Sequence, residues 1–375
     1  MNRLFSMHRR AAGVLGCILL GACGNSSLSS APDPAQSGQI VATHAVLCDL
    51  AQQLLQDPKR LTCLMQAGED AHSYQPTPQD RQALETASLI LYNGYDFEAG
   101  MGKLLQSTKV ATVAVAEQAV PNPREGQSHD HADPHSTDSH SHSGSQGEAD
   151  PHDHGDHDLD ISDQNRPESE ASPQTQGDSG SPQADNDVQA DPHVWHNPQH
   201  GIKMVAVIAT ALGDLDPERR ADYQQREAAI AQDLQEIDRW IQAQVQTIPT
   251  DQRVIWSTHE SLGYFGEAYG LSVEGILTGL NPDQKPAAAK LKAVVDELRQ
   301  TKAPTLFAEL GEPSPLLQSV AKDAGKTLAA NPLITDGLNQ PGRPGDTYKA
   351  MLVYNTRNIV TELGGTIRGE IQDLK

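Results

Sequence analysis

The stretch Gln39–Gln56, QIVATHAVLCDLAQQLLQ, decides the fold of this 375-residue chain. Its first five residues form a short β-branched run, which is typical of a buried strand. The apolar residues after this run recur every three or four positions, the spacing of one helix face: Val46, Leu47, Leu50, Leu54 and Leu55. A strand that leads directly into a helix is the repeating unit of a parallel sheet with helical crossovers.

The same alternation continues on both sides of a long polar stretch. Strands are predicted at 60–65, 88–94 and 109–117 before it, and at 253–259, 271–277, 305–310 and 326–330 after it. Helical patterns lie between these strands. One of them begins with Thr77 as the N-cap and Pro78 as the first helical residue. The sequence therefore predicts an α/β fold with mainly parallel sheets.

One predicted helix is much longer than the others. Its apolar residues keep helical spacing over about 30 residues, or ~45 Å: Tyr223, Ile230, Leu234, Ile237, Ile241, Val245 and Ile248. We interpret residues 216–249 as a rigid linking helix between an N-terminal lobe, 38–215, and a C-terminal lobe, 250–375. A ligand is then expected in the cleft between the two lobes.

The first 23 residues have the layout of a secretory signal peptide, in which arginines precede a short apolar run. The run ends in Leu20-Gly21-Ala22-Cys23, which resembles the bacterial lipobox. Cys23 is therefore the predicted lipidation site, and the alternative is an ordinary signal peptide with an incidental cysteine. Residues 24–37 are expected to be a flexible tether. The protein is expected in the periplasm or cell envelope, held to a membrane by a lipid anchor.

Two cysteines, Cys48 and Cys63, remain outside the signal. In an exported protein these two cysteines can form a disulfide between a helix and the following strand. The alternative is two buried thiols that behave as small apolar side chains.

Residues 121–190 form a polar insert in the N-terminal lobe. Between Glu125 and Asp191 there are 17 acidic residues and one basic residue, so this segment supplies most of the net charge of −22. Its composition gives it no core, and it is predicted to be disordered. Its eight histidines alternate with acidic residues, which indicates an auxiliary low-affinity zinc binder: His129, His131, His135, His140, His142, His152, His154 and His157. The alternative is a solvated acidic linker.

Three histidines outside the insert stand where a parallel sheet places ligands. His72 follows one predicted strand, His259 ends another, and His193 follows the insert. Because ligands bind beyond the carboxyl ends of parallel strands, we expect these three side chains to converge in the cleft. Three imidazoles and one oxygen donor complete a tetrahedral zinc site. Asp336 is the best-placed oxygen donor, and Glu309 or a water molecule are the alternatives.

Four segments resemble the signatures of the metal-specific solute-binding proteins of ABC transporters. They are HSYQPTPQD (72–80), DPHVW (191–195), STHESLGYFGEAYGL (257–271) and LITDGL (333–338). The resemblance covers the mature chain apart from the insert. It implies two lobes bridged by a rigid helix, with a buried metal held by a specific set of ligands: His72, His193, His259 and Asp336. One departure is QAGEDAHSY, where many members have a Pro-His pair.

The resemblance is to the zinc branch of this family. Zinc members have a histidine at the position of His259, where manganese members tend to have glutamate, and they often carry a His/Asp-rich loop before the DPHVW segment. This implies capture of Zn²⁺ in the cell envelope and its delivery to an ABC permease for zinc uptake. A monomer is expected.

Several other polar residues lie near the predicted cleft. His44 and Glu69, like Glu309, are candidates for secondary metal contacts, and the neighbour of Glu69, Asp70, is expected to be a solvated carboxylate. His196 and His200 are expected on the surface, and a place directly behind the metal ligands is the alternative.

Other function classes fit the sequence less well. A zinc hydrolase would use the same three histidines with an open coordination position, but the sequence contains no HExxH motif and no serine or cysteine nucleophile constellation, so we predict no enzyme. Manganese or iron transport is the alternative within the same fold. A second role in adhesion stays open. Nucleic acid is excluded as a partner because the chain has no basic stripe and a strongly acidic insert.

Overall fold

The N-terminal sheet has four parallel strands in the order β2-β1-β3-β4. A computed structural model describes residues 38–69, 71–126, 189–276, 288–311 and 315–371. The strands are β1 (Ile40–Ala42), β2 (Leu61–Cys63), β3 (Leu89–Tyr92) and β4 (Ala111–Ala114). Val41 pairs with Thr62 on one side and with Ile90 on the other. The central strands β1 and β3 carry most of the buried apolar residues of this sheet, as the sequence predicts.

Four helices accompany this sheet: α1 (Ala45–Leu55), α2 (Pro78–Thr86), α3 (Gly102–Ser107) and α4 (Val115–Ala119). Thr77 caps α2 in a capping box with Asp80, as its sequence predicts. The predicted strand 109–117 is wrong at its end, because the chain turns into α4 after Ala114. An apolar run of Val and Ala fits a buried helix as well as a buried strand.

The C-terminal strands form two separate two-stranded sheets. They are β5 (Val254–Ser257), β6 (Ser272–Gly275), β7 (Thr305–Leu306) and β8 (Thr327–Leu328). Parallel pairing joins β5 to β6 and β7 to β8. The amide of Phe307 donates to the carbonyl of Trp256 at 2.8 Å and so brings β7 beside β5.

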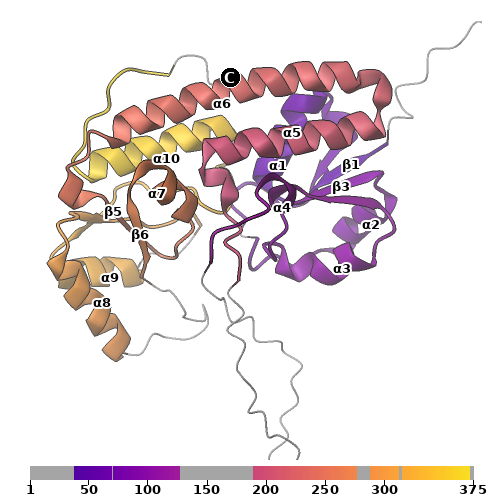
Figure 1. The fold of residues 1–375 in the computed structure, drawn as a ribbon. Coiled ribbons are helices and arrows are strands. Elements are labelled where there is room, and N and C mark those ends of the chain that lie inside the picture. Colours follow the sequence, from indigo (N-terminus) through magenta and orange to yellow (C-terminus); the bar gives the residue numbers. More distant parts are fainter. Residues whose placement is uncertain (1–37, 70, 127–188, 277–287, 312–314, 372–375) are drawn as a thin grey trace, which may run out of the picture. The chain divides into compact units, whose positions relative to one another are not determined.

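Six helices complete the described fold. Short helices α7 (Gly263–Tyr269), α8 (Ala288–Gln300) and α9 (Pro315–Ala324) accompany the C-terminal strands. Three longer helices, α5 (Pro198–Leu215), α6 (Arg220–Val245) and α10 (Tyr348–Glu362), pack side by side (Figure 1). The predicted long helix is α6, whose stripe of apolar side chains is buried. The α/β class, the parallel sheets and the long helix are confirmed.

The predicted insert is wrong at both ends, because residues 121–126 and 189–190 have defined positions. Glu125 and Ala190 form an antiparallel bridge, and the carbonyl of Arg124 accepts from the amide of Asp191 at 3.0 Å. A Cβ on Gly126 would lie 2.9 Å from the amide nitrogen of Asp191, so glycine permits this close approach. We call this paired segment, 124–126 with 189–191, the stem.

Several predictions fall outside the described residues. These are the signal peptide, the lipidation site Cys23, the tether and the eight histidines of the insert. Cys48 and Cys63 lie within the described residues and form a disulfide that joins α1 to β2, with an S–S distance of 2.08 Å. None of the described helices is both long and apolar enough to cross a membrane.

Candidate metal site

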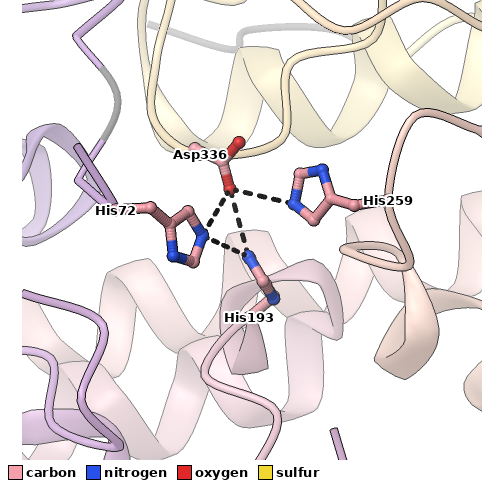
Figure 2. Close-up of side chains that lie close together, drawn as sticks. All are labelled: His72, His193, His259 and Asp336. Carbon is pink, nitrogen blue, oxygen red and sulfur yellow. Dashed lines mark hydrogen bonds and ion pairs between the residues drawn. The ribbon is translucent and has the colours of Figure 1, made fainter. Parts of the chain in front are cut away.

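The structure brings together the side chains of His72, His193, His259 and Asp336, as Figure 2 shows. His72 lies in the loop after β2, and His259 lies directly beyond β5. His193 precedes the 3-10 turn η4 (Val194–His196), and Asp336 lies in the loop between β8 and α10. One ligand atom from each side chain lies within 4.8 Å of all the others.

The distances in this cluster centre on one carboxylate oxygen. Asp336 Oδ1 lies 3.1 Å from His193 Nε2, 3.6 Å from His259 Nε2 and 3.7 Å from His72 Nε2. The Nε2 atoms of His72 and His193 are 3.4 Å apart. In a tetrahedral zinc site with bond lengths of about 2.0–2.1 Å, neighbouring ligand atoms are about 3.3–3.4 Å apart. The cluster therefore has the dimensions of a small tetrahedral metal site.

A buried carboxylate orients the imidazole of His193. Asp191 Oδ1 accepts from the backbone amide of His193 at 3.0 Å and lies 2.9 Å from its Nδ1. Nδ1 therefore carries the proton that it donates to Asp191, and Nε2 faces the other ligand atoms. Such carboxylate–histidine pairs fix the ring orientation and raise the donor strength of a metal ligand.

His259 has the same kind of partner. Glu309, which is 1% exposed, places Oε2 2.8 Å from His259 Nδ1, and its Oε1 accepts from the His259 amide at 3.0 Å. Glu309 Oε2 also accepts from the Thr335 hydroxyl at 2.9 Å. Glu309, the alternative oxygen donor that the sequence predicts, thus lies behind His259 and outside the four-residue cluster.

The carboxylates give the cluster a strong affinity for protons. Burial would lower the pKa of His193, but hydrogen bonds to Asp191 and Asp336 outweigh it and raise this pKa to about 9. Burial would also lower the pKa of His259, but the negative charges of Glu309 and Asp336 outweigh it and raise this pKa well above its usual range. Burial would raise the pKa of Asp336, yet the neighbouring histidines hold it well below its usual range. A divalent cation would replace these protons.

An aromatic ring packs against two of the proposed ligands. The buried ring of Phe97 makes edge contacts with His72 at 5.1 Å and with His193 at 5.8 Å between ring centroids. Tyr95 and Asp96, just before it, have left-handed φ angles of 55° and 53°. This conformation is uncommon outside glycine and is found where the surrounding structure holds the backbone in place.

His196 is fully buried, so its predicted place on the surface is wrong. Its Nε2 donates to the carbonyl of Thr335 at 2.9 Å, and Trp195 Nε1 donates to the same carbonyl at 3.1 Å. Burial lowers the pKa of His196 to about 3, so the ring stays neutral. The 3-10 turn after His193 is therefore hydrogen-bonded to Thr335, the residue before Asp336. His200 is half-buried beside Tyr264, so its predicted surface position is wrong as well.

The other predicted polar residues lie outside the cluster. His44 is buried between Phe97 and Trp195, and burial lowers its pKa to about 3. Within the described residues, neither ring nitrogen of His44 makes a hydrogen bond of normal geometry. The side chain of Asn93 lies close enough to His44 to offset part of the lowering of its pKa. Glu69 is exposed and accepts from the amide of Gln66 at 2.6 Å. Asp70 is outside the described residues.

Two residues have other places in the structure than the sequence predicts. Glu309 is an alternative metal ligand in the sequence, but it lies behind His259. Arg124 belongs to the predicted insert, but it pairs with Asp191 beside the cluster. The spacing of Asp191 two residues before His193 was an available signal for a carboxylate partner. No comparable local signal connects Glu309 with His259, which are 50 residues apart.

Relatives of this chain are named metal-binding or metal-transport lipoproteins. The chain is 25% identical to the manganese-binding lipoprotein MntA of Halalkalibacterium halodurans, over 92% of this chain and 95% of that protein. It is also 25% identical to the manganese ABC transporter substrate-binding lipoprotein PsaA of Streptococcus pneumoniae, over 95% and 99% of the two chains.

Among solved structures, the periplasmic zinc-binding protein TroA of Treponema pallidum has the same fold. It aligns with a TM-score of 0.66 at 23% identity, over 87% of this chain and 99% of that one. The family model described as zinc-uptake complex component A, periplasmic (ZnuA), matches residues 40–362. The chain therefore belongs to the ZnuA family, whose members are metal-binding solute-binding proteins of ABC transporters and not enzymes.

Proposed function

We propose that this protein captures Zn²⁺ in the cell envelope and delivers it to an ABC permease. The observation that carries this proposal is the cluster of three imidazoles and one carboxylate, with a buried carboxylate behind two of the imidazoles. Imidazole-rich tetrahedral sets suit zinc, and zinc also stands above manganese in the general affinity order of divalent metals. His72, His193, His259 and Asp336 are the proposed ligands.

Manganese is the second candidate, because relatives of this chain are named manganese-binding. Manganese favours oxygen ligands, and the cluster has one primary carboxylate with a second, Glu309, directly behind His259. A shift of Glu309 toward the metal would raise the oxygen count. The nitrogen-rich arrangement in the structure favours zinc.

Location and organisation form part of the proposal. Relatives are named lipoproteins, which supports the lipidation site Cys23 and a position at a membrane surface.

The proposed lobes, 38–215 and 250–375, would supply ligands from both sides, and the linking segment 216–249 contains α6. A bridge of this kind limits how far two lobes can move apart when metal enters and leaves.

The test is a competition titration of the purified metal-free protein with Zn²⁺ and Mn²⁺, combined with metal analysis of the protein as isolated. The proposal predicts one tight zinc site per chain and binding of Mn²⁺ that is weaker by at least about tenfold, or ~1.4 kcal/mol. Equal or tighter binding of Mn²⁺ would replace zinc by manganese as the transported ion.

A further inference from the structure

A row of alternating charges leads from the protein surface to one proposed ligand. Glu267 on α7 is 64% exposed and accepts from Arg124 Nη1 at 3.0 Å. Arg124 Nε lies 3.7 Å from Asp191 Oδ2, and Asp191 Oδ1 lies 2.9 Å from His193 Nδ1. The side chains become less exposed along this row, with values of 35% for Arg124, 7% for Asp191 and 4% for His193.

The surroundings of Arg124 are built to hold it there. Tyr264 accepts from the Arg124 amide at 2.9 Å and donates to the carbonyl of Asp191 at 3.1 Å, while its ring lies 5.8 Å from the guanidinium. A Cβ on Gly263 would lie 2.9 Å from both Arg124 Nε and Asp191 Oδ2. The glycine at the start of α7 therefore leaves the space in which this ion pair forms.

Asp191 does not need Arg124 for its orientation. Its Oδ1 is already held by the amide and the ring of His193, both within its own segment. The contribution of Arg124 is therefore its charge, which neutralises part of the negative charge that Asp191 directs at His193 and at a bound cation. Glu267 in turn neutralises part of the charge of Arg124.

We propose that the positive charge of Arg124, acting through Asp191, keeps metal affinity below the value that the ligands alone would give. This inference rests on the proposed function. A delivery protein must release its metal, and a cation next to the carboxylate of one ligand favours release. Glu267 opposes this effect from the exposed end of the row, where a docking partner has access to it.

The proposal makes opposite predictions for the two ends of the row. Metal dissociation constants and chelator-driven release rates would be measured for the full chain and for the variants Arg124→Gln, Arg124→Lys and Glu267→Gln. With Zn²⁺, Arg124→Gln is expected to bind about threefold or more tightly and to release more slowly, whereas Glu267→Gln is expected to bind more weakly. Arg124→Lys keeps the charge and should stay close to the wild type.

Two controls separate charge from structure. Lys292→Gln removes a charge from an exposed ion pair on α8 and should leave metal affinity unchanged. The gain in Arg124→Gln should shrink as salt rises to about 0.5 M, because Arg124 is partly exposed and salt screens its charge.

Weaker binding in both Arg124→Gln and Glu267→Gln would assign Arg124 a structural role and overturn the proposal, as would an unchanged affinity in Arg124→Gln. A wild-type protein that binds neither Zn²⁺ nor Mn²⁺ would instead contradict the proposed function.

Discussion

Glu309 Oε2 lies 2.8 Å from His259 Nδ1, on the side of the ring opposite to the proposed metal position. The two residues come from the ends of neighbouring strands, since His259 follows β5 and Glu309 follows β7. The carboxylate determines which ring nitrogen carries the proton. It therefore directs Nε2 toward the proposed metal without touching the metal itself.

Replacing this carboxylate should weaken metal binding while leaving the four-residue cluster complete. We expect Glu309→Gln to lower zinc affinity by about tenfold or more, because partners of this kind typically account for 10- to 100-fold in affinity. A competition titration measures the effect. Glu297→Gln, an exposed position on α8, is the matched control. Wild-type affinity in Glu309→Gln would show that the pair has no part in binding.

Removing any proposed histidine ligand should have a larger effect. His72→Ala, His193→Ala and His259→Ala each delete one nitrogen donor, and each should weaken the tight zinc site by more than about tenfold, or ~1.4 kcal/mol. Isothermal titration of the three variants measures this loss. If two of them kept wild-type affinity, the ligand set would be wrong.

Metal affinity should still change with pH well above the ordinary pKa of histidine. The ordinary histidine pKa of about 6.5 places the loss of affinity below that pH. In the structure, carboxylates raise the pKa of His193 to about 9. Below that pH the metal-free ring holds a proton that the metal must displace, so affinity should rise from pH 7 toward pH 9 and fall steadily below pH 7.

Proton release gives a direct measurement of the same linkage. Titrations at pH 7 in buffers of different ionisation enthalpy should show net release of protons on zinc binding, because His193 and His259 both have raised pKa values. Binding without proton release at pH 7 would contradict the charge state inferred for the metal-free cluster.

The disulfide between Cys48 and Cys63 should stabilise the chain rather than its metal site. It closes a loop with a sequence separation of 15 residues, for which a stabilisation of about 3 kcal/mol is expected from loop entropy. Urea unfolding of metal-free protein, with Cys48→Ser and with the double variant Cys48→Ser/Cys63→Ser, measures this difference. Equal stability of variants and wild type would show that the bond contributes little. Zinc affinity should stay unchanged in the folded variants.

Local sequence patterns predict the fold class, and they single out the four residues that the structure brings together. Strand and helix periodicities alternate along the chain, and residues beyond strand ends must meet at one edge of a parallel sheet. The same patterns could not show that His196 is buried, because its hydrogen-bond partner, the carbonyl of Thr335, is 139 residues away. Histidine in a turn before a helix is usually exposed, and only the tertiary contact overrides that expectation.

Composition likewise misplaced the ends of the insert. Pro121–Gly126 contains little that is apolar, so it resembles the polar stretch that follows it. Its position depends on contacts that no local pattern reveals, such as the bond from the Arg124 amide to Tyr264, 140 residues further along the chain. Any test of the insert must therefore leave the stem in place.

Deleting residues 127–188 and joining Gly126 to Gln189 through a short Gly/Ser bridge should separate the insert from the metal site. The described contacts of the cluster and of the stem all lie outside the deletion. We expect a nearly unchanged thermal transition without metal, one tight zinc site, and loss of the weaker zinc binding that is predicted for the eight histidines of the insert. A longer deletion, 121–190, is the comparison, because it also removes Arg124 and its backbone pairing with Asp191. Zinc stoichiometry by titration distinguishes the outcomes. Loss of the tight site in the shorter deletion, with the fold intact, would mean that the insert supplies primary ligands and that the four-residue cluster is not the complete site.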